Sequence, residues 1–439
     1  MIGETTIRLS DLCDLVADQV NPTHRADDIY IGLEHVLSGR FVRSGEGKAE
    51  DVQSTKYAFQ PGDVLYGKLR PYLDKAVLAI DAGICTTELL VLRPKNGVDP
   101  RFLISVVHAP TFVEHAVSGT TGVQHPRTSW NHISDFELSE FGADEQAKVA
   151  NLLWEIHDAI TANEAAIEAG ADLKRVAMRE LFTRGLRGEA QKETEIGPVP
   201  ESWAFNKLGD IAEIVYGAQA AVANATDPSI GTLILTNVNL DLEGHIDLAK
   251  RRYYKVPEAH RERLSLHKGD VLFNWRSGSA NHIGKTVFFD LDGEFTYSSF
   301  ILRFRPHRCV ANKFLFWWLT YLRVNGFFTS QRNVSSINSV YNASLSATIP
   351  VCVPDDEQQR EIVAILDAID RKIDLQRKKR AVLDELFKAL LHKLITGDIR
   401  VADLDLSALA SRGPGPACRR GRGVCMAARS HVPHLAWGL

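Results

Sequence analysis

One helical segment occurs twice in this chain, and that repeat restricts the possible folds more than any other feature of the sequence. Asp144–Gln146 recurs as Asp356–Gln358, 212 positions later (356 minus 144), and after one inserted residue the register holds at 213. Leu181–Thr183 likewise recurs as Leu394–Thr396. A repeat of this length is a duplicated domain with its helix, and it excludes a solenoid of short repeats.

Apolar residues within both copies step by four, three and four positions. This spacing is a heptad seam, which requires a partner helix. The seam residues are Val149, Leu153, Ile156 and Ile160 in the first copy and Ile362, Leu366, Ile369 and Ile373 in the second. Two helices of about 36–40 residues, each about 55–60 Å long at 1.5 Å per residue, are therefore predicted to pair as an antiparallel rod.

Polar and glycine residues mark the ends of both helices. Asp144 and Asp356 fit the N-cap position, and Gly185 and Gly397 fit the position just after a helix. Gly170 lies in the middle of the first copy, where glycine costs about 1 kcal/mol relative to alanine. We therefore expect a kink or a weak point at Gly170.

The segments before the two helices resemble each other more weakly. Pro61–Tyr66 matches Lys268–Phe273, Glu88–Pro94 matches Phe300–Pro306, and Ile7–Asp11 matches Asn206–Asp210. In the first pair Gly-Asp supplies a turn and β-forming residues follow, which predicts a strand. Further strands are predicted within 84–92 and 298–304, and helices within 101–116 and 312–328. Short strands with interspersed helices predict two mixed domains of the α+β class, separated by the two long helices.

These patterns divide the chain into six consecutive parts. The predicted parts are a first domain at 1–143, a long helix at 144–185, a linker at 186–203, a second domain at 204–355, a second long helix at 356–398 and a tail at 399–439. The linker is polar and is then punctuated by Pro and Gly. The tail is rich in Gly, Pro, Arg and Ala without periodicity, so we expect it to be disordered.

Composition excludes several classes of protein. With 45% hydrophobic and 24% charged residues, the chain is an ordinary globular one. It has no apolar run long enough for a membrane span and no basic, then apolar, secretory signal at its start. The six cysteines are scattered without a Cys-x-x-Cys pair, which predicts a reducing cytoplasm and no disulfide framework. A net charge of −4 leaves only local clusters to indicate nucleic-acid binding.

Basic, amide and aromatic residues cluster at matched places in the two domains, and they are our candidates for contact with DNA. Arg and Lys can contact guanine edges and phosphates, and Asn can contact adenine edges. The candidates are Lys68, Arg70, Tyr72, Lys75, His125, Arg127 and Thr128 in the first domain, and Asn274, Trp275, Arg276, Asn281, His282, Lys285, Arg332, Asn333, Ser335 and Asn338 in the second. The alternative is that these are solvated loops with Tyr72 and Trp275 packed underneath.

Motifs for catalysis or cofactor binding are missing from the sequence. It contains no His-Glu-x-x-His pair, no Gly-x-Ser-x-Gly elbow and no Asn/Asp-Pro-Pro-aromatic tetrapeptide. The segment 278–286 has five residues between its glycines, where a phosphate loop needs four. Cys418, Cys425, His431 and His434 fit no familiar zinc spacing. We therefore expect no catalytic site, metal or cofactor in this chain.

Taken together, the motifs resemble those of the specificity (S) subunits of Type I restriction–modification systems. The resemblance rests on the duplicated helices, on Pro198-x-Pro200-x-x-Trp203 leading into Lys207–Ile211, on the Gly-Asp-Val-Leu strands, and on Gly67–Leu73. It extends from about residue 7 to about residue 400. The first repeat lacks the Pro-x-Pro-x-x-Trp segment, so its edge is expected to be trimmed or completed by the C-terminal end of the chain.

The resemblance implies a non-catalytic protein that binds double-stranded DNA. Each domain would be a target-recognition domain for one half of a split sequence, and the helical rod would set the gap. The rod would also dock two methyltransferase (M) subunits, and motor-nuclease (R) subunits would join for cleavage. S-adenosylmethionine, ATP and Mg would belong to those partners, and the base to be methylated would flip into an M subunit.

Three other interpretations remain open at this stage. A coiled-coil scaffold or adaptor that binds other proteins would explain the rod and the near-neutral charge. A solitary specificity factor in a related system would explain the loops. An ATP-binding protein that uses Lys285 is disfavoured by the spacing of the glycines around it.

Overall fold

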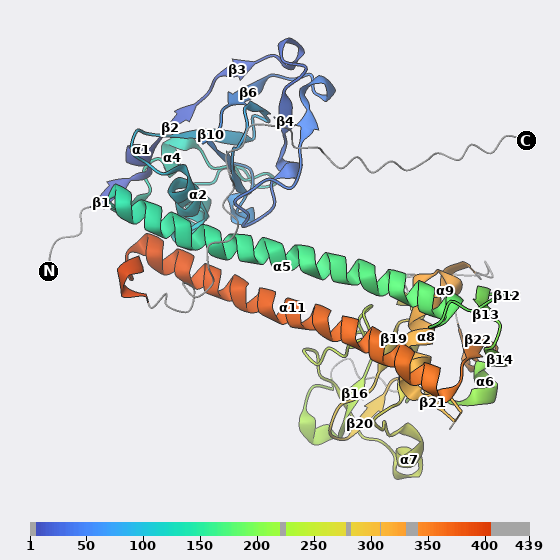
Figure 1. The fold of residues 1–439 in the computed structure, drawn as a ribbon. Helices are drawn as coiled ribbons and strands as arrows, with labels where there is room; N and C mark the ends of the chain where they lie inside the picture. Colours follow the sequence, from blue (N-terminus) through green and yellow to red (C-terminus); the bar gives the residue numbers. More distant parts are fainter. Residues whose placement is uncertain (1–5, 220–224, 278–281, 308, 331–340, 405–439) are drawn as a thin grey trace, which may run out of the picture. The chain divides into compact units, whose positions relative to one another are not determined.

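The computed structural model describes residues 6–219, 225–277, 282–307, 309–330 and 341–404, and the chain divides into two compact units. The first unit comprises residues 1–157 and 386–439, and the second comprises residues 158–385. Each unit holds one domain of mixed helix and sheet and part of both long helices (Figure 1). The predicted α+β class is confirmed. Among the described residues, no helix has the length and apolar character of a membrane span.

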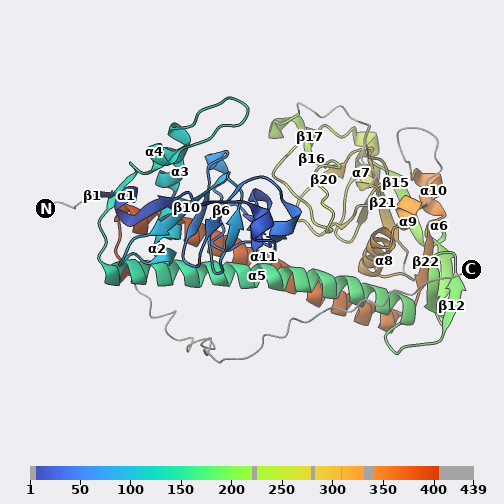
Figure 2. The ribbon, with the colours of Figure 1, turned by 90° about the horizontal axis from the view of Figure 1, so that it is seen from above.

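Helices α5 (Ala143–Arg184) and α11 (Asp356–Thr396) are the two long helices. Figures 1 and 2 show them side by side, α5 in green and α11 in orange. In the second unit Glu164 pairs with Arg380 and Lys174 pairs with Asp370, so the residue numbers rise along one helix and fall along the other. The predicted antiparallel pairing is therefore confirmed.

The heptad seam is buried, but not only by the partner helix. Seven of its eight residues are buried, and Ile369 is half-buried. Ile362 and Leu366 belong to the hydrophobic core of the second domain, together with Met178 and Phe182 of α5. The seam therefore attaches a domain as well as pairing two helices.

The helix ends differ slightly from the prediction. Asp355, one residue before the predicted cap, accepts a bond from the backbone N–H of Gln358 at 2.8 Å. Asp144 lies inside the first turn of α5, where its carboxylate still faces the positive end of the helix dipole. Gly185 and Gly397 follow the last helical residues with φ of +65° and +80°, as expected for C-terminal glycines.

Gly170 does not interrupt α5. A Cβ atom at this position would lie 2.8 Å from Cγ1 of Ile373, which is closer than real contacts allow. Glycine therefore lets α5 and α11 approach each other closely at this position. The expectation of a kink or weak point is replaced by a close contact between the two helices.

In the first domain, two sheets carry the core. Strands β2 (Cys13–Val16), β10 (Leu89–Pro94), β7 (Val64–Gly67) and β8 (Ala76–Leu78) form an antiparallel sheet in that order. The other sheet has the order β3 (Gln19–Val20), β6 (Lys56–Phe59), β9 (Gly83–Cys85), β4 (Ile29–Ile31) and β5 (Gly47–Lys48), with β4 and β9 parallel. Strand β1 (Thr6–Arg8) pairs with β11 (Glu137–Ser139).

The second domain repeats the four-stranded sheet and the parallel strand pair of the first. Strands β15 (Ala212–Tyr216), β21 (Ile301–Pro306), β18 (Val271–Asn274) and β19 (Thr286–Phe288) form the equivalent antiparallel sheet. A parallel pair again occurs in the sheet with the order β17 (Tyr253–Tyr254), β16 (Thr232–Leu235) and β20 (Phe295–Tyr297). Strand β14 (Ala204–Lys207) pairs with β22 (Pro350–Val353) as β1 pairs with β11. The structure therefore supports the duplication.

The shared Gly-Asp motif has a structural role in both domains. Asp63 accepts two bonds of 2.8 Å from Arg93, and Asp270 accepts bonds of 2.7 and 2.8 Å from Arg305. Each pair ties the start of one strand to the neighbouring strand of the same sheet. Because the same ion pair recurs, it belongs to the common framework and not to the parts that differ between the domains.

A glutamine on each long helix shows the true register of the repeat. Gln146 accepts the backbone N–H of Asp99, and Gln359 accepts that of Ala311, the residues that precede helices α2 (Pro100–His108) and α8 (Asn312–Val324). Gln146 therefore corresponds to Gln359 and not to Gln358. The shift of 213 already applies at the start of the helices.

Each of the two predicted domain helices is divided. In the first domain, α2 ends before Pro110, where α3 (Pro110–Ser118) begins, because proline has no N–H to continue the helix. In the second, α8 and α9 (Phe327–Ser330) are separated at Gly326, whose φ is +77°. Shorter helices complete the domains: α1 (Leu9–Leu12), α4 (Trp130–Ile133), α6 (Leu208–Ile211), α7 (Arg261–Leu264) and α10 (Ala343–Ala347).

The segments after the two long helices are ordered where the structure describes them. Residues 186–203, predicted as a linker, contain the hairpin β12 (Gln191–Thr194) and β13 (Gly197–Pro200). Trp203 is fully buried and donates a bond to Gln358. After α11, Arg400 pairs with Glu145 at 3.0 Å and lies over the ring of Phe141. Arg400 thus lies against the edge of the first domain, which agrees with the expectation that the C-terminal end of the chain completes this edge.

Candidate nucleic-acid interface

The first domain brings its two candidate clusters together into one surface, which we call the paired loops (residues 68–75 and 121–128). The backbone N–H of Arg70 donates to Pro126 at 2.7 Å, and that of Thr128 donates to Lys68 at 3.0 Å. Leu69 and Arg127 also form a β-bridge. Residues 56 to 60 positions apart in sequence are therefore joined through their backbones.

Arg70 has the conformation and the free donors of a contact residue. Its φ of 53° places it in the left-handed region, as does that of Asp74, and such backbone strain is concentrated at functional sites. Within the described residues, its guanidinium donates one long bond, to the Gln124 carbonyl at 3.4 Å. Tyr72 and His125 are exposed beside it, and Lys68 is half-buried. These four side chains are available to a ligand.

Three other candidates in the first domain are occupied by internal contacts. The guanidinium of Arg127 donates to both carboxylate oxygens of Glu88, and these hydrogen bonds raise the pKa of Arg127. The Lys75 ammonium donates to the Leu33 carbonyl at 2.7 Å, and Thr128 is buried. These internal contacts position the loops, and direct contact of these residues with DNA stays a prediction.

In the second domain, most of the described candidates also pack inward. Asn274 is buried, and its amide donates to the carbonyl of His282, which is itself exposed. Trp275 donates to the Ser299 carbonyl at 2.7 Å and packs edge to face against Tyr216. The alternative of a tryptophan packed beneath the loop therefore describes Trp275.

Lys285 is wrongly predicted as a phosphate contact. Only 5% of the residue is exposed, and its ammonium donates to the carbonyls of Asn237 and Leu240 at 2.8 and 2.6 Å. Burial lowers the pKa of Lys285. Both carbonyls belong to the loop at 236–247, so Lys285 anchors that loop. The same burial disfavours an ATP-binding role for Lys285.

Arg276 borders a cavity of about 610 Å³ at the end of strand β18. The guanidinium of Arg276 lies over the ring of Phe300, 5.7 Å from its centre. Tyr216 and Tyr254 come from the ends of β15 and β17, and Arg263 comes from α7. The cavity thus gathers aromatic and basic side chains from five separate segments of one domain.

Five candidates lie outside the described residues: Asn281, Arg332, Asn333, Ser335 and Asn338. The described residue that follows the last four is Tyr341, whose backbone N–H donates to Trp275 at 3.0 Å. The equivalent bond in the first domain joins Thr128 to Lys68. Tyr341 and Thr128 therefore bond equivalent residues of the first cluster in their own domains.

Sequence reasoning did not find Tyr216, Tyr254, Arg263 or Phe300 as site residues. Phe300 was inside a matched motif, but it was interpreted as part of a strand. Its equivalent, Glu88, precedes the same strand in the first domain and contacts Arg127 there. That equivalence is the one signal in the sequence that could have identified the position.

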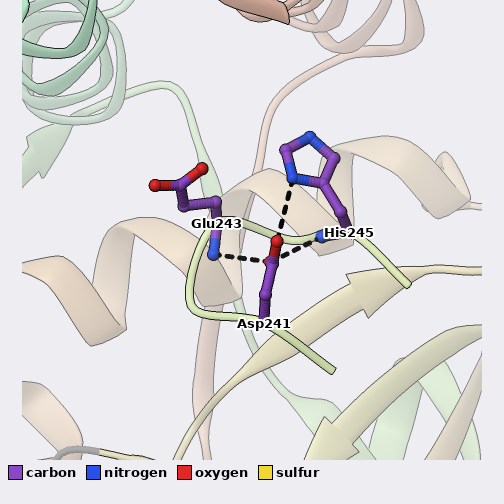
Figure 3. Close-up of side chains that lie close together, drawn as sticks. All are labelled: Asp241, Glu243 and His245. Carbon is purple, nitrogen blue, oxygen red and sulfur yellow. Dashed lines mark hydrogen bonds and ion pairs between the residues drawn. The ribbon is translucent and has the colours of Figure 1, made fainter. Parts of the chain in front are cut away.

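Asp241, Glu243 and His245 lie close together and could in principle hold a metal ion (Figure 3). His245 bonds Asp241 at 3.1 Å and pairs with Asp374 of α11 at 3.3 Å, while Glu243 pairs with Arg377. Burial alone would raise the pKa of Asp241, but hydrogen bonds from His245 and from backbone N–H groups lower it to about 2. The hydrogen bond with Asp241 raises the pKa of His245. Every member is ion-paired, so we interpret the cluster as a charge network that holds the loop on α11.

Comparisons with known proteins agree with this architecture. The family model of the Type I restriction modification DNA specificity domain matches residues 200–385. The Type I restriction enzyme MjaVIII specificity subunit of Methanocaldococcus jannaschii is 23% identical over 426 residues, covering 91% of this chain and 93% of the relative. The putative MjaX specificity subunit of the same organism is 31% identical over 217 residues, 47% of this chain and 48% of the relative.

Among solved structures, the Type I restriction–modification S subunit from M. genitalium is similar to 90% of this chain, over 97% of its own length. The TM-score is 0.59 and the identity is 15%. This likeness shows the fold of the chain.

Proposed function

Because the chain belongs to the family of Type I restriction–modification specificity subunits, we propose that its two domains read the two halves of a split DNA target. The observation that carries this proposal is one framework, built twice, with different residues at equivalent places. Lys68 and Trp275 follow equivalent strands, and Glu88 and Phe300 precede equivalent strands. A common framework with unlike loops recognises two unlike half-sites.

Base recognition would depend on the side chains that remain available. Arg70 in the first domain and Arg276 in the second can each form a bidentate contact with guanine, worth about 1–3 kcal/mol of discrimination. Lys68 would add phosphate affinity, which depends on salt and not on sequence. The gap between the half-sites would be set by α5 and α11.

The partners would supply the chemistry. We propose that this chain has no catalytic role and that methyltransferase subunits, with S-adenosylmethionine, modify the DNA that it selects. Motor-nuclease subunits with ATP and Mg would cleave. With a net charge of −4, this chain alone would bind DNA weakly, so the methyltransferase subunits would supply much of the DNA affinity. A cytoplasmic location follows from these partners and stays a prediction.

An exposed apolar stripe on both long helices supports docking of two copies of one partner. On each helix its residues lie seven, four and three positions apart, which places them on one face. The stripe consists of Ala162, Ala169, Leu173 and Val176 on α5 and of Leu375, Val382, Leu386 and Ala389 on α11, all exposed. Each α11 residue is 213 positions after its α5 counterpart, so the two stripes are repeats of one surface.

Methylation mapping tests the proposal. The full chain would be co-purified with its cognate methyltransferase subunit, and adenine methylation would be mapped on random DNA. We expect a split motif with one fixed gap. A stable complex that methylates a continuous motif would contradict two separate reading domains, and failure to bind any methyltransferase subunit would favour the adaptor interpretation.

A further inference from the structure

We propose that the cavity of the second domain binds one nucleotide of the DNA target, with its base unstacked from the duplex. The inference rests on the proposed function, because it concerns how the second half-site is read. The nucleotide would differ from the methylated adenine, which a methyltransferase subunit takes up.

The walls of the cavity have the chemistry that holds a single base. Tyr216, Tyr254, Trp275 and Phe300 all line it. Base stacking on aromatic side chains tolerates any base, because every base has a π-face. Four aromatic residues around one opening exceed what a reader of base edges in a groove requires, since edge reading depends on hydrogen bonds.

Two of the aromatic walls, Trp275 and Tyr216, are held in place before a ligand arrives. The indole N–H of Trp275 donates to the Ser299 carbonyl, and the centre of its ring lies 5.4 Å from that of Tyr216. The hydroxyl of Tyr216 accepts the backbone N–H of Ala343 at 2.7 Å. A preorganised wall lowers the entropic cost of binding.

Positive groups accompany the aromatic walls. Arg263, Arg276 and His260 line the same cavity, and no carboxylate occurs among its described lining residues. Arg263 is exposed and donates to the Tyr216 carbonyl at 3.2 Å, which leaves further donors of its guanidinium. Arg263 is therefore placed to bind the phosphate of a nucleotide whose base lies against the rings, and Arg276, over the ring of Phe300, lies beside that base.

The volume suits a ligand of this size. About 610 Å³ lies within the range of roughly 300–1,000 Å³ typical of small-molecule sites. A side chain that only reads the edge of a paired base would need no such space. The cavity lies at the end of β18, which Trp275 and Arg276 follow, and this is also where the second half-site would be read.

The first domain lacks these walls at equivalent places. Lys68 and Leu69 stand where the second domain has Trp275 and Arg276, and Glu88 stands where it has Phe300. Glu88 is bound by Arg127, whose guanidinium occupies that side of the loop. The structure therefore assigns nucleotide uptake to the second domain.

A mismatch scan of the mapped target tests this inference. Unstacking costs less when the base is already unpaired, so a mismatch at the position that is taken up strengthens binding. Using the full chain with its methyltransferase subunit, we expect one position in the second half-site, other than the methylated adenine, where a mismatch strengthens binding by about tenfold. Phe300→Ala and Arg276→Gln would abolish that gain.

The matched control is Phe205→Ala. Phe205 is 46% exposed and lies on β14 of the same domain, whereas Phe300 is 42% exposed at the cavity. The control should keep the mismatch gain. A scan without any such position, or a gain that survives Phe300→Ala, would overturn the proposal.

Two further experiments distinguish a free nucleotide from a nucleotide of the DNA, and failure of the cavity proposal from failure of the proposed function. If the cavity binds a free nucleotide, then dAMP, dCMP, dGMP or dTMP at millimolar concentration will bind the chain without DNA, and Phe300→Ala will abolish this binding. The mismatch scan will then show no position where a mismatch strengthens binding. That pair of results would overturn the proposal that the nucleotide comes from the DNA target. If wild-type protein methylates no split motif, the proposed function itself fails. If the motif is present and the scan and mononucleotides are both negative, only the cavity proposal fails.

Discussion

Two arginines of this protein, Arg303 and Arg70, differ in how deeply they are buried and in the role that we give them. Arg303 is almost fully buried, donates to the carbonyls of Arg263 and Ser265, and pairs with Glu213. Arg70, by contrast, makes one long bond in the described part of the chain. Since both are arginines in loops or short strands, residue type alone does not separate the two roles.

Replacing Lys285 tests its structural role. Lys285→Met leaves the carbonyls of Asn237 and Leu240 without their donor, and a buried unsatisfied group costs about 1–3 kcal/mol. We expect the free energy of unfolding in urea to fall by that amount while the salt dependence of DNA binding stays unchanged. Lys68→Met is the matched variant, and it should lower the salt slope by about one unit. A lowered slope for Lys285→Met would restore it as a phosphate contact.

His245 predicts a pH-dependent contribution to stability. The hydrogen bond with Asp241, together with nearby Asp374 and Asp370, raises the pKa of His245 above its usual 6.5. Its contribution is therefore complete below pH 6.5 and is lost as the pH rises through the raised value. Asp241, with a pKa of about 2, stays ionised throughout this window.

The measurement is the thermal midpoint of wild type and His245→Gln at pH 6 and pH 9. We expect the difference between the two proteins to be larger at pH 6. Exposed His267 supplies the control His267→Gln, which should show no such trend. A difference that grows with pH would show that His245 is neutral in the folded protein.

At the scale of single elements, Gly170 is a point of close approach between the two long helices, where a Cβ atom would lie 2.8 Å from Cγ1 of Ile373. Gly170→Leu would push against Ile373, and overpacking of this kind costs about 1–3 kcal/mol. Ala165→Leu, at an exposed position of the same helix, should change stability by less than about 0.5 kcal/mol. The measurement is the free energy of unfolding in urea of both variants and of wild type. Equal values for Gly170→Leu and Ala165→Leu would contradict a close contact at Gly170.

Helix α5 and helix α11 could be predicted because helical periodicity is a local property of the sequence. The breaks at Pro110 and Gly326 were missed, although both residues are ordinary helix terminators, because the apolar pattern continues past them. The hairpin at 191–200 was missed because Pro and Gly also punctuate linkers. Local signals therefore identified elements better than their ends.

Contacts between distant segments could not be predicted in the same way. The two clusters of the first domain were found, but the bond that joins Arg70 to Pro126 depends on sheet register. The cavity was missed because Tyr216 ends β15, Trp275 follows β18 and Phe300 precedes β21, three strands that are far apart in the sequence. The burial of Lys285 depends on the fold of the loop at 236–247, which no local pattern shows.

At the scale of the whole molecule, the duplication separates what is common from what varies. The ion pairs of Asp63 and Asp270 and the capping bonds of Gln146 and Gln359 occur in both copies. The residues next to the equivalent strands differ. A new recognition specificity can therefore arise by changing loops without changing the framework.

The repeated apolar stripe predicts that partner binding can be weakened in two separate steps. Leu375→Glu places a charge at a position that is 65% exposed, so folding should be unaffected, while a buried interface would lose about 2 kcal/mol or more. The expected result is a complex with one methyltransferase subunit in place of two, measured by native mass spectrometry. Leu345→Glu, at an exposed position outside the helices α5 and α11, is the control. Two bound subunits in both variants would refute this docking surface.

The central claim is that the two domains read their half-sites independently. The most direct measurement is the methylated motif of three complexes, formed by the wild-type chain, Arg70→Gln and Arg276→Gln with the same methyltransferase subunit. We predict that Arg70→Gln relaxes one base position in one half of the motif, and that Arg276→Gln relaxes one position in the other half, with the gap unchanged. If both substitutions altered the same half, or if either changed the gap, the account of two independent reading domains would be contradicted.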